Sequence, residues 1–275
     1  MHSLKDTMTL NNGVTMPGFG LGVWRVPDGE AVIHSVKWAI QAGYNLIDTA
    51  AIYGNEKGVG EAIRQSEISR DSLFLTTKVW NADQGYDTTL KAFETSLKKL
   101  GLETVDLYLI HWPVAGKYKE TWKAMERLYK EGRVRAIGVC NFHQHHLEEL
   151  LNDSEIMPAV NQIEMHPLLA QIPLRNYCYE KDIKVEAYSP LGSGGVLDHP
   201  TLTALAEKYG KTAAQIILRW DLQNDVITIP RSTQEAHILS NADIFDFELS
   251  PQDIDKIDGL NENKRFGANP DQFDF

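Results

Sequence analysis

Short apolar segments rich in β-branched or aromatic residues alternate with amphipathic helical patterns along almost the whole chain. The eight expected strands are residues 19–23, 45–50, 73–79, 105–111, 135–141, 159–165, 184–190 and 226–230. Apolar strands that alternate with helices are typical of parallel strands buried on both faces. Eight such units predict a (β/α)8 TIM barrel. A doubly wound open sheet is the alternative fold, but no GxGxxG motif follows the first strand to open a helix.

The segments outside this alternation predict additions to the barrel. Asn12-Gly13 lies between two short alternating runs, a pattern typical of a tight β-hairpin, which we expect to cap the far end of the barrel. Two helical segments, residues 199–224 and 250–261, exceed what a minimal barrel needs. There is no linker, low-complexity tract or internal repeat, so residues 1–275 are expected to form a single domain.

Composition argues against several classes of partner. The 38 acidic and 27 basic residues give a net charge of −11, which disfavours a nucleic-acid-binding face. No apolar run approaches the roughly 18 residues of a membrane span, and the first residues lack the apolar core of a secretory signal. Two cysteines are too few for a disulfide framework and favour a reducing compartment. We expect a cytoplasmic monomer with no nucleic-acid or membrane partner.

Three predicted strands carry an ionisable side chain at or near their carboxyl ends. Asp48, Lys78 and His111 stand at these ends, and Tyr53 follows Asp48 by five residues. In a parallel barrel the carboxyl ends of the strands and the loops after them build the active site. Each residue alone has an ordinary structural explanation, but burying a lysine and an aspartate together is costly unless they pair. The four side chains are therefore expected to converge.

A paired Lys78 and Asp48 would tune Tyr53 for proton transfer. A neighbouring cation favours the phenolate, so we expect the pKa of Tyr53 to be lowered from about 10. Such a phenol can protonate a developing alkoxide and take the proton back in the reverse direction. A neutral His111 could orient a substrate carbonyl. This set suits carbonyl reduction and lacks only a source of hydride.

A series of motifs resembles the aldo-keto reductases. GFGLGVW, IDTAAIYGNE, TTKVW, DLYLIHWP, AIGVCNF, NQIEMHP, EAYSPLG and ITIPRS come in the order and spacing of that family. The resemblance covers essentially the whole chain. It is strongest to the small bacterial members, the glyoxal/methylglyoxal reductases and the 2,5-diketo-D-gluconate reductases. It implies a barrel that binds NADPH in an extended pose without a Rossmann motif. It also implies a catalytic tetrad of Asp48, Tyr53, Lys78 and His111, with Tyr53 as general acid.

The same resemblance implies the binding residues. Asn141 and Gln162 would contact the cofactor carboxamide, and Tyr188 would stack on the nicotinamide. The remaining implied cofactor contacts are Gly22, Val23, Asp48, Ser189, Leu191, Ser193, Ile229, Arg231, Ser232, His237 and Asn241. The implied substrate pocket consists of Trp24, Tyr53, Trp80, His111 and Trp112.

Departures from the family pattern bear on cofactor preference. Arg231 replaces the usual lysine after Ile-Pro, keeps its charge and can hold a phosphate with two hydrogen bonds. His237 replaces an expected arginine, and a neutral imidazole grips a 2′-phosphate less firmly. Cys140 replaces a serine and loses a good hydrogen-bond donor. NADPH is the expected cofactor, with NADH used at lower efficiency.

The expected function is NADPH-dependent reduction of aldehydes and ketones, with methylglyoxal, glyoxal and other small carbonyls as substrates in an open pocket. A keto-sugar reductase of the 2,5-diketo-D-gluconate type and a low-turnover, cofactor-sensing barrel are alternatives. A Schiff-base lyase is disfavoured, because Asp48 would keep Lys78 protonated. The aromatic tail DQFDF either covers the pocket mouth or frays.

Three histidines, His143, His145 and His146, lie close together in the sequence. The pattern suggests a metal site, but adjacent residues on a helix are expected to diverge, so His145 and His146 would not share a face. No metal site is predicted.

Overall fold

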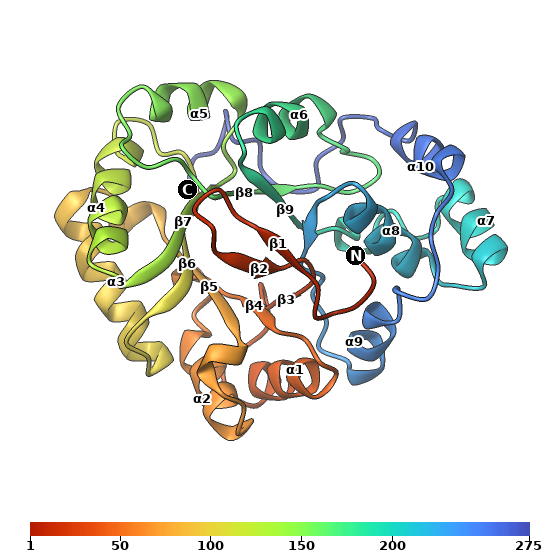
Figure 1. Cartoon of the computed structure of the whole chain (residues 1–275), viewed down its shortest axis with the longest axis horizontal. Coiled ribbons are helices and arrows are strands. Elements are labelled where there is room, and N and C mark those ends of the chain that lie inside the picture. The colour runs from red at the N-terminus through yellow and green to blue at the C-terminus, as the bar shows by residue number, and fades with distance from the viewer.

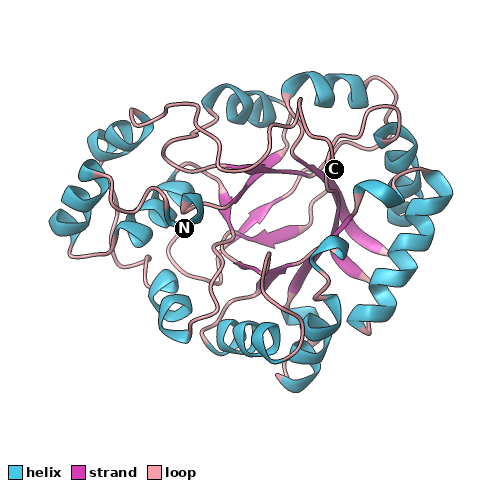
Figure 2. Ribbon diagram, turned by 180° about the vertical axis from the view of Figure 1, so that it is seen from behind, coloured by secondary structure: helices cyan, strands magenta, loops and turns pink.

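The computed structural model describes residues 1–275, which form a closed barrel of parallel strands inside a ring of helices (Figures 1 and 2). The strands are β3 (Leu21–Gly22), β4 (Leu46–Asp48), β5 (Phe74–Val79), β6 (Val105–Ile110), β7 (Val134–Cys140), β8 (Val160–Glu164), β9 (Lys184–Tyr188) and β10 (Ile227–Thr228). Each strand pairs in parallel with the next along the chain, and a bridge between Phe19 and Thr228 joins the two ends of the sheet. The predicted (β/α)8 barrel is confirmed.

Eight helices form the outer ring, one for each strand. They are α1 (Glu30–Gln41), α2 (Glu56–Gln65), α3 (Tyr86–Leu100), α4 (Tyr118–Lys130), α5 (Gln144–Leu151), α6 (Ile172–Glu180), α8 (Ala213–Gln223) and α9 (Glu235–Ala242). The apolar residues Val32, Val36 and Ala39 lie on one side of α1 and have no exposed surface, so this side is the buried face of the helix. No helix combines the length and the apolar character needed to cross a membrane.

The additions to the barrel agree only in part with expectation. β1 (Thr7–Thr9) and β2 (Thr15–Pro17) form the predicted hairpin (Figure 1), and Met8 and Met16 pack into the interior cluster at the amino-terminal ends of the strands. Segment 199–224, expected whole as an extra helix, is instead two helices, because Gly210 adopts a φ of 64° and ends the first. Only α7 (Pro200–Tyr209) and α10 (Pro251–Asp258) are additional to the barrel.

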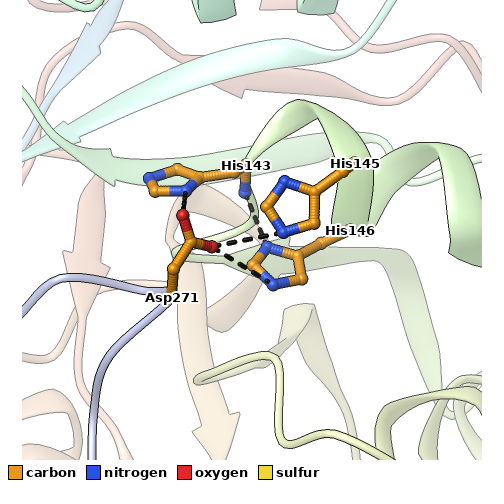
Figure 3. A group of neighbouring side chains, drawn as sticks. All are labelled: His143, His145, His146 and Asp271. Atoms are coloured by element: carbon orange, nitrogen blue, oxygen red, sulfur yellow. Dashed lines mark hydrogen bonds and ion pairs between the residues drawn. The ribbon is translucent and has the colours of Figure 1, made fainter.

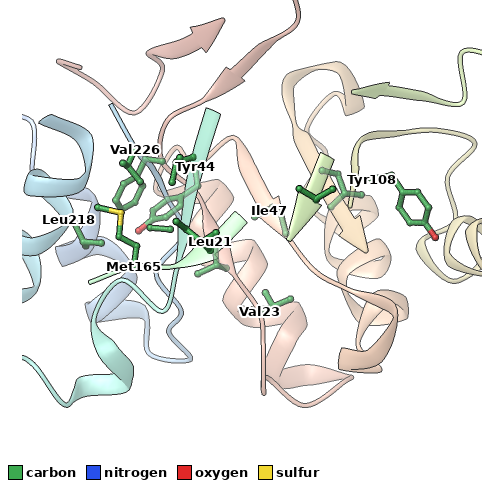
Figure 4. Close-up of a cluster of buried hydrophobic side chains, with 14 of the residues drawn as sticks. Leu21, Val23, Tyr44, Ile47, Tyr108, Met165, Leu218 and Val226 are labelled. Carbon is green, nitrogen blue, oxygen red and sulfur yellow. The ribbon is translucent and has the colours of Figure 1, made fainter. Parts of the chain in front are cut away.

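Strand residues alternate between two separate apolar cores. Ile47 and Leu75 belong to the outer core between strands and helices, part of which is drawn in Figure 4, whereas Leu46 and Phe74 belong to the core inside the barrel. Side chains alternate along a strand, so the inward stripe that starts at Leu46 continues to Asp48 two residues later. Apolar residues therefore fill one end of the barrel interior, and polar ones lie at the carboxyl end.

Gly22 lies at the seam where β3 meets β10. A Cβ at this position would lie 2.9 Å from the carbonyl oxygen of Ile229. We expect Gly22→Ala to lower the free energy of unfolding by about 1–3 kcal/mol, because the two strands must move apart. Chemical denaturation measures this loss, and an unchanged denaturation midpoint would contradict the argument. The NADPH affinity of the folded variant tests separately the cofactor contact predicted for Gly22.

Candidate active site

The four residues predicted to form a catalytic tetrad lie together at the carboxyl end of the barrel. Lys78 donates hydrogen bonds to both carboxylate oxygens of Asp48, at 2.6 and 2.8 Å, and to the hydroxyl of Tyr53 at 3.4 Å. Tyr53 is presented by a short 3-10 turn that ends at Gly54. The rings of Tyr53 and His111 meet edge-on with centroids 5.7 Å apart.

At neutral pH Lys78 is positively charged and His111 is neutral. Burial is the largest single effect on the pKa of Lys78 and would lower it, but the charge of Asp48, the hydrogen bond to Asp48 and smaller effects of Tyr53 and Cys140 together outweigh burial and raise the pKa, so the ammonium group stays charged. Burial lowers the pKa of His111 well below its usual range, and the charge of Lys78 acts in the same direction. The imidazole is therefore neutral, as predicted, and its buried Nδ1 has no hydrogen-bond partner.

The pKa of Tyr53 is raised, and the prediction of a lowered value is wrong. Burial of the hydroxyl is the largest cause, Asp48 adds to it, and the opposing effect of Lys78 is too small to offset them. The phenol is therefore fully protonated at neutral pH. A phenol of high pKa releases its proton only to a strong base, such as the alkoxide that develops when a carbonyl is reduced.

Gln162 links Asp48 to a second buried carboxyl group. Its Nε2 donates to Asp48 at 2.8 Å and to Glu186 at 2.7 Å. Glu186 on β9 has no exposed surface, and sequence reasoning missed it. The available signal was its position two residues before Tyr188 on the same strand, which places both side chains on the inward face.

Asn141 is the other amide predicted to contact the cofactor. It adopts a left-handed φ of 66°, donates to the carbonyl of His111 at 3.1 Å and accepts a hydrogen bond from Tyr188 at 2.8 Å. Cys140, in place of the family's serine, is buried, and its sulfur accepts a hydrogen bond from Asn141 at 3.2 Å. Burial raises the pKa of the Cys140 thiol, so it stays protonated.

The other predicted cofactor residues fall into three neighbouring segments. Gly22 and Val23 lie at the seam of the barrel, Ser189, Leu191 and Ser193 follow β9, and Ile229, Arg231, Ser232, His237 and Asn241 run from β10 into α9. Arg231 and His237 are exposed near the amino-terminal end of α9, where the helix dipole favours an anion. Ser232 and Asn241 are buried beside them in the chain. Their cofactor contacts stay predictions.

The aromatic tail lies over the predicted substrate pocket. Phe275 stacks on Trp80 with centroids 5.9 Å apart and meets Trp112 edge-on at 5.1 Å, and Phe273 also contacts Trp112 at 5.1 Å. The expectation of an open pocket is therefore wrong. Trp24, by contrast, is 41% exposed and packs against the guanidinium of Arg25.

Buried and half-buried polar groups hold this tail and the residues just before it in place. Glu164 accepts the backbone N–H groups of Phe266 at 2.6 Å and Gly267 at 3.1 Å. Further along, Asp271 lies among the three histidines at the start of α5 (Figure 3), with its carboxylate 2.9 Å from Nδ1 of His143 and 3.2 Å from Nε2 of His145. The tail is thus fixed at two places before it reaches the tryptophans.

The histidine cluster is more compact than predicted. The rings of His145 and His146 lie 3.9 Å apart and both face Asp271, so the expectation that they diverge is wrong. Burial lowers the pKa of His146 to about 4. Its Nδ1 accepts the backbone N–H of His143 at 3.1 Å, which leaves the proton of the neutral ring on Nε2, facing the carboxylate.

The surroundings of Asp271 suit a carboxylate better than a metal cation. Arg265 approaches Nε2 of His143 to 3.0 Å, so the proton of that ring also points from Nδ1 toward Asp271. The positive end of the α5 dipole lies at the same place. A metal cation would have to displace these histidine ring protons. It would also be repelled by the guanidinium of Arg265 and by the positive amino-terminal end of α5. We therefore interpret the histidine cluster as a set of contacts that holds the C-terminal segment, residues 264–275, in place.

The chain is similar in sequence and in structure to known proteins. The sequence profile described as "Aldo/keto reductase family" matches residues 18–262. The chain is 60% identical to glyoxal reductase of Bacillus subtilis (strain 168), with 99% of both chains covered. It is 45% identical to methylglyoxal reductase DkgA of Escherichia coli (strain K12), with 96% of both chains covered. A crystal structure of a Gox0644 mutant in complex with NADPH superposes with a TM-score of 0.94 at 42% identity, covering 98% of this chain and 99% of that one.

Proposed function

This chain belongs to the aldo/keto reductase family, and on that premise we propose that it reduces aldehydes and ketones to alcohols with NADPH. The observation that carries the proposal is the contact of Tyr53 with a buried Lys78–Asp48 pair, beside a neutral His111 with an unpaired buried nitrogen. A protonated phenol, a cation next to it and a free hydrogen-bonding group are what the protonation of a reduced carbonyl oxygen requires.

Side chains of the protein supply the proton and stabilise the group that donates it, and NADPH when bound supplies the hydride. Tyr53 gives its proton to the carbonyl oxygen as negative charge develops there. Lys78 stabilises the phenolate that remains, and Asp48 keeps Lys78 in place and charged. His111 positions the carbonyl oxygen with a hydrogen bond from its ring.

Small carbonyl compounds are the proposed substrates. Two relatives are named for glyoxal and methylglyoxal. The position of Phe275 against Trp80 and Trp112 narrows the entrance to the pocket, which favours small aldehydes over a keto-sugar. A keto-sugar would require the tail to move.

The direct test is NADPH consumption followed by absorbance, with methylglyoxal as substrate and NADH in a parallel assay. Consumption of NADPH that depends on methylglyoxal would support the proposed reductase. If no aldehyde in a panel caused consumption while NADPH still bound, the chain would be a cofactor-sensing barrel instead.

Arg231 is proposed to recognise the 2′-phosphate of NADPH. It is exposed before α9, and its planar guanidinium can make two hydrogen bonds to a phosphate. We expect Arg231→Ala to raise KM for NADPH by about tenfold or more, the loss typical of a hydrogen bond to a charged group, and to leave KM for NADH almost unchanged. Steady-state kinetics with both cofactors measures the difference. A wild-type enzyme that used NADH as efficiently as NADPH would contradict the assignment.

A further inference from the structure

The hydrogen-bond network around Gln162 holds two carboxyl groups, Asp48 and Glu186, but one ammonium group, that of Lys78. Asp48 and Glu186 are both buried, and the same Nε2 of Gln162 donates to each of them. The hydrogen bonds continue from Asp48 to Lys78 and from Lys78 to Tyr53. Glu186 is therefore connected to the proton donor through an unbroken chain of buried polar groups, although the mechanism above gives it no role.

The two carboxyl groups differ in how well a negative charge is supported. Asp48 accepts two hydrogen bonds from the Lys78 ammonium group in addition to that of Gln162. Glu186 accepts a single bond from a neutral amide at Oε2, and its Oε1 is buried without a partner. A buried carboxylate oxygen with no donor is costly, and a protonated carboxyl avoids most of that cost. If one of the two carboxyl groups is protonated, the proton is therefore on Glu186 and Asp48 carries the negative charge.

We propose that Glu186 is a positioning residue of this active site, which holds the Gln162 amide in place and carries a proton that limits the site to one carboxylate opposite Lys78. The inference rests on the proposed reductase function. Loss of the proton would add a second negative charge close to Asp48 and Lys78. The phenolate that Tyr53 forms during reduction would then be less stable, and turnover would fall.

The pH at which this happens follows from the surroundings of Glu186. The charged and titratable groups that face it are Asp48 on β4, Lys78 on β5 and Cys140 on β7. Burial, with the charge of Asp48 acting in the same direction, raises the pKa of Glu186 to about 8. Tyr53 cannot account for loss of activity in this range, since burial raises its own pKa far higher. We therefore expect activity to decline at alkaline pH, and we assign this expected decline to Glu186.

The first test is the pH profile of kcat for methylglyoxal reduction with saturating NADPH. For the wild type we expect a decline of about tenfold per pH unit above about 8, the form of a single ionisation. Glu186→Gln, which cannot ionise, should not show that decline. Glu126 is a buried residue outside the barrel, and its carboxylate accepts the backbone N–H of Glu155. Glu126→Gln is therefore the matched control and should show the same decline as the wild type. An unchanged decline in Glu186→Gln would overturn the proposal.

NADPH affinity, measured by fluorescence, tests the positioning role separately. Glutamine at 186 can still accept from Gln162, whereas leucine cannot. We expect Glu186→Leu to weaken NADPH binding by about three- to tenfold, the effect of one hydrogen bond, and Glu186→Gln to restore it. Equal affinities of both variants would show that Glu186 does not hold the amide.

Thermal denaturation provides a test that needs no activity. A carboxyl whose folded-state pKa is raised stabilises the protein fully below its unfolded value near 4.5, and this stabilisation is lost as pH rises to about 8. The melting temperature of Glu186→Gln relative to wild type should therefore increase between pH 5 and pH 8.5. A difference independent of pH would contradict a proton on Glu186. Absence of any reductase activity in the wild type would instead refute the proposed function and leave this measurement decisive.

Discussion

Replacement of Tyr53 by phenylalanine is expected to lower kcat for aldehyde reduction by about 10²–10⁴-fold, the usual contribution of a positioned proton donor. The ring would keep its contact with His111, and only the hydroxyl bonded to Lys78 would be lost. NADPH affinity and thermal stability should change little. Single-turnover kinetics with saturating NADPH measures the chemical step directly.

Tyr179→Phe is the matched control, because its side chain is 78% exposed and lies far along the chain from the tetrad. It should react at the wild-type rate. Near-normal turnover in Tyr53→Phe would mean that another group protonates the carbonyl oxygen. His111 is an unsuitable replacement, since its lowered pKa leaves it without an acidic proton at neutral pH.

The barrel could be predicted because local patterns determine it. Apolar strands that end in Asp48, Lys78 and His111 gave both the element order and the end of the barrel at which the polar groups meet. Strand lengths were less predictable. Residues 226–230 were expected as a strand, but only Ile227 and Thr228 pair with β9. Beyond this pair Ile229 still donates to the carbonyl of Ala187 on β9, whereas Pro230, which has no N–H, only accepts from Gly22 on β3 across the seam.

The details of the site depend on contacts that no local pattern contains. Asp271 bonds to His143 across 128 residues of chain, and this contact helps to place the tail over Trp80. The pKa of Tyr53 was predicted in the wrong direction because the effect of Lys78 follows from strand order, whereas the larger effect of burial depends on the packed structure. Glu186 was missed because a single acidic residue within an apolar strand carries no signal of its partners.

Replacement of Lys78 by methionine is expected to have the largest effect on stability, lowering the free energy of unfolding by about 3–5 kcal/mol. Lys78 has no exposed surface and Asp48 only 2%, so the variant would leave a buried carboxylate with Gln162 as its remaining side-chain partner. Reductase activity should also fall, because the Tyr53 phenolate loses its neighbouring cation.

A double-mutant cycle separates the buried pair from the general loss of a lysine. Lys78→Met combined with Asp48→Asn removes the unpaired charge and should recover a large part of the lost stability, although not the activity. Lys119→Met is the matched surface control: its ion pairs with Glu149 and Asp153 are exposed, and its cost should be about 1 kcal/mol or less. Chemical denaturation at pH 7 measures all four proteins against wild type, Asp48→Asn included. If Lys78→Met were no less stable than Lys119→Met, the Asp48–Lys78 pair would not be the buried ion pair on which the proposed mechanism depends.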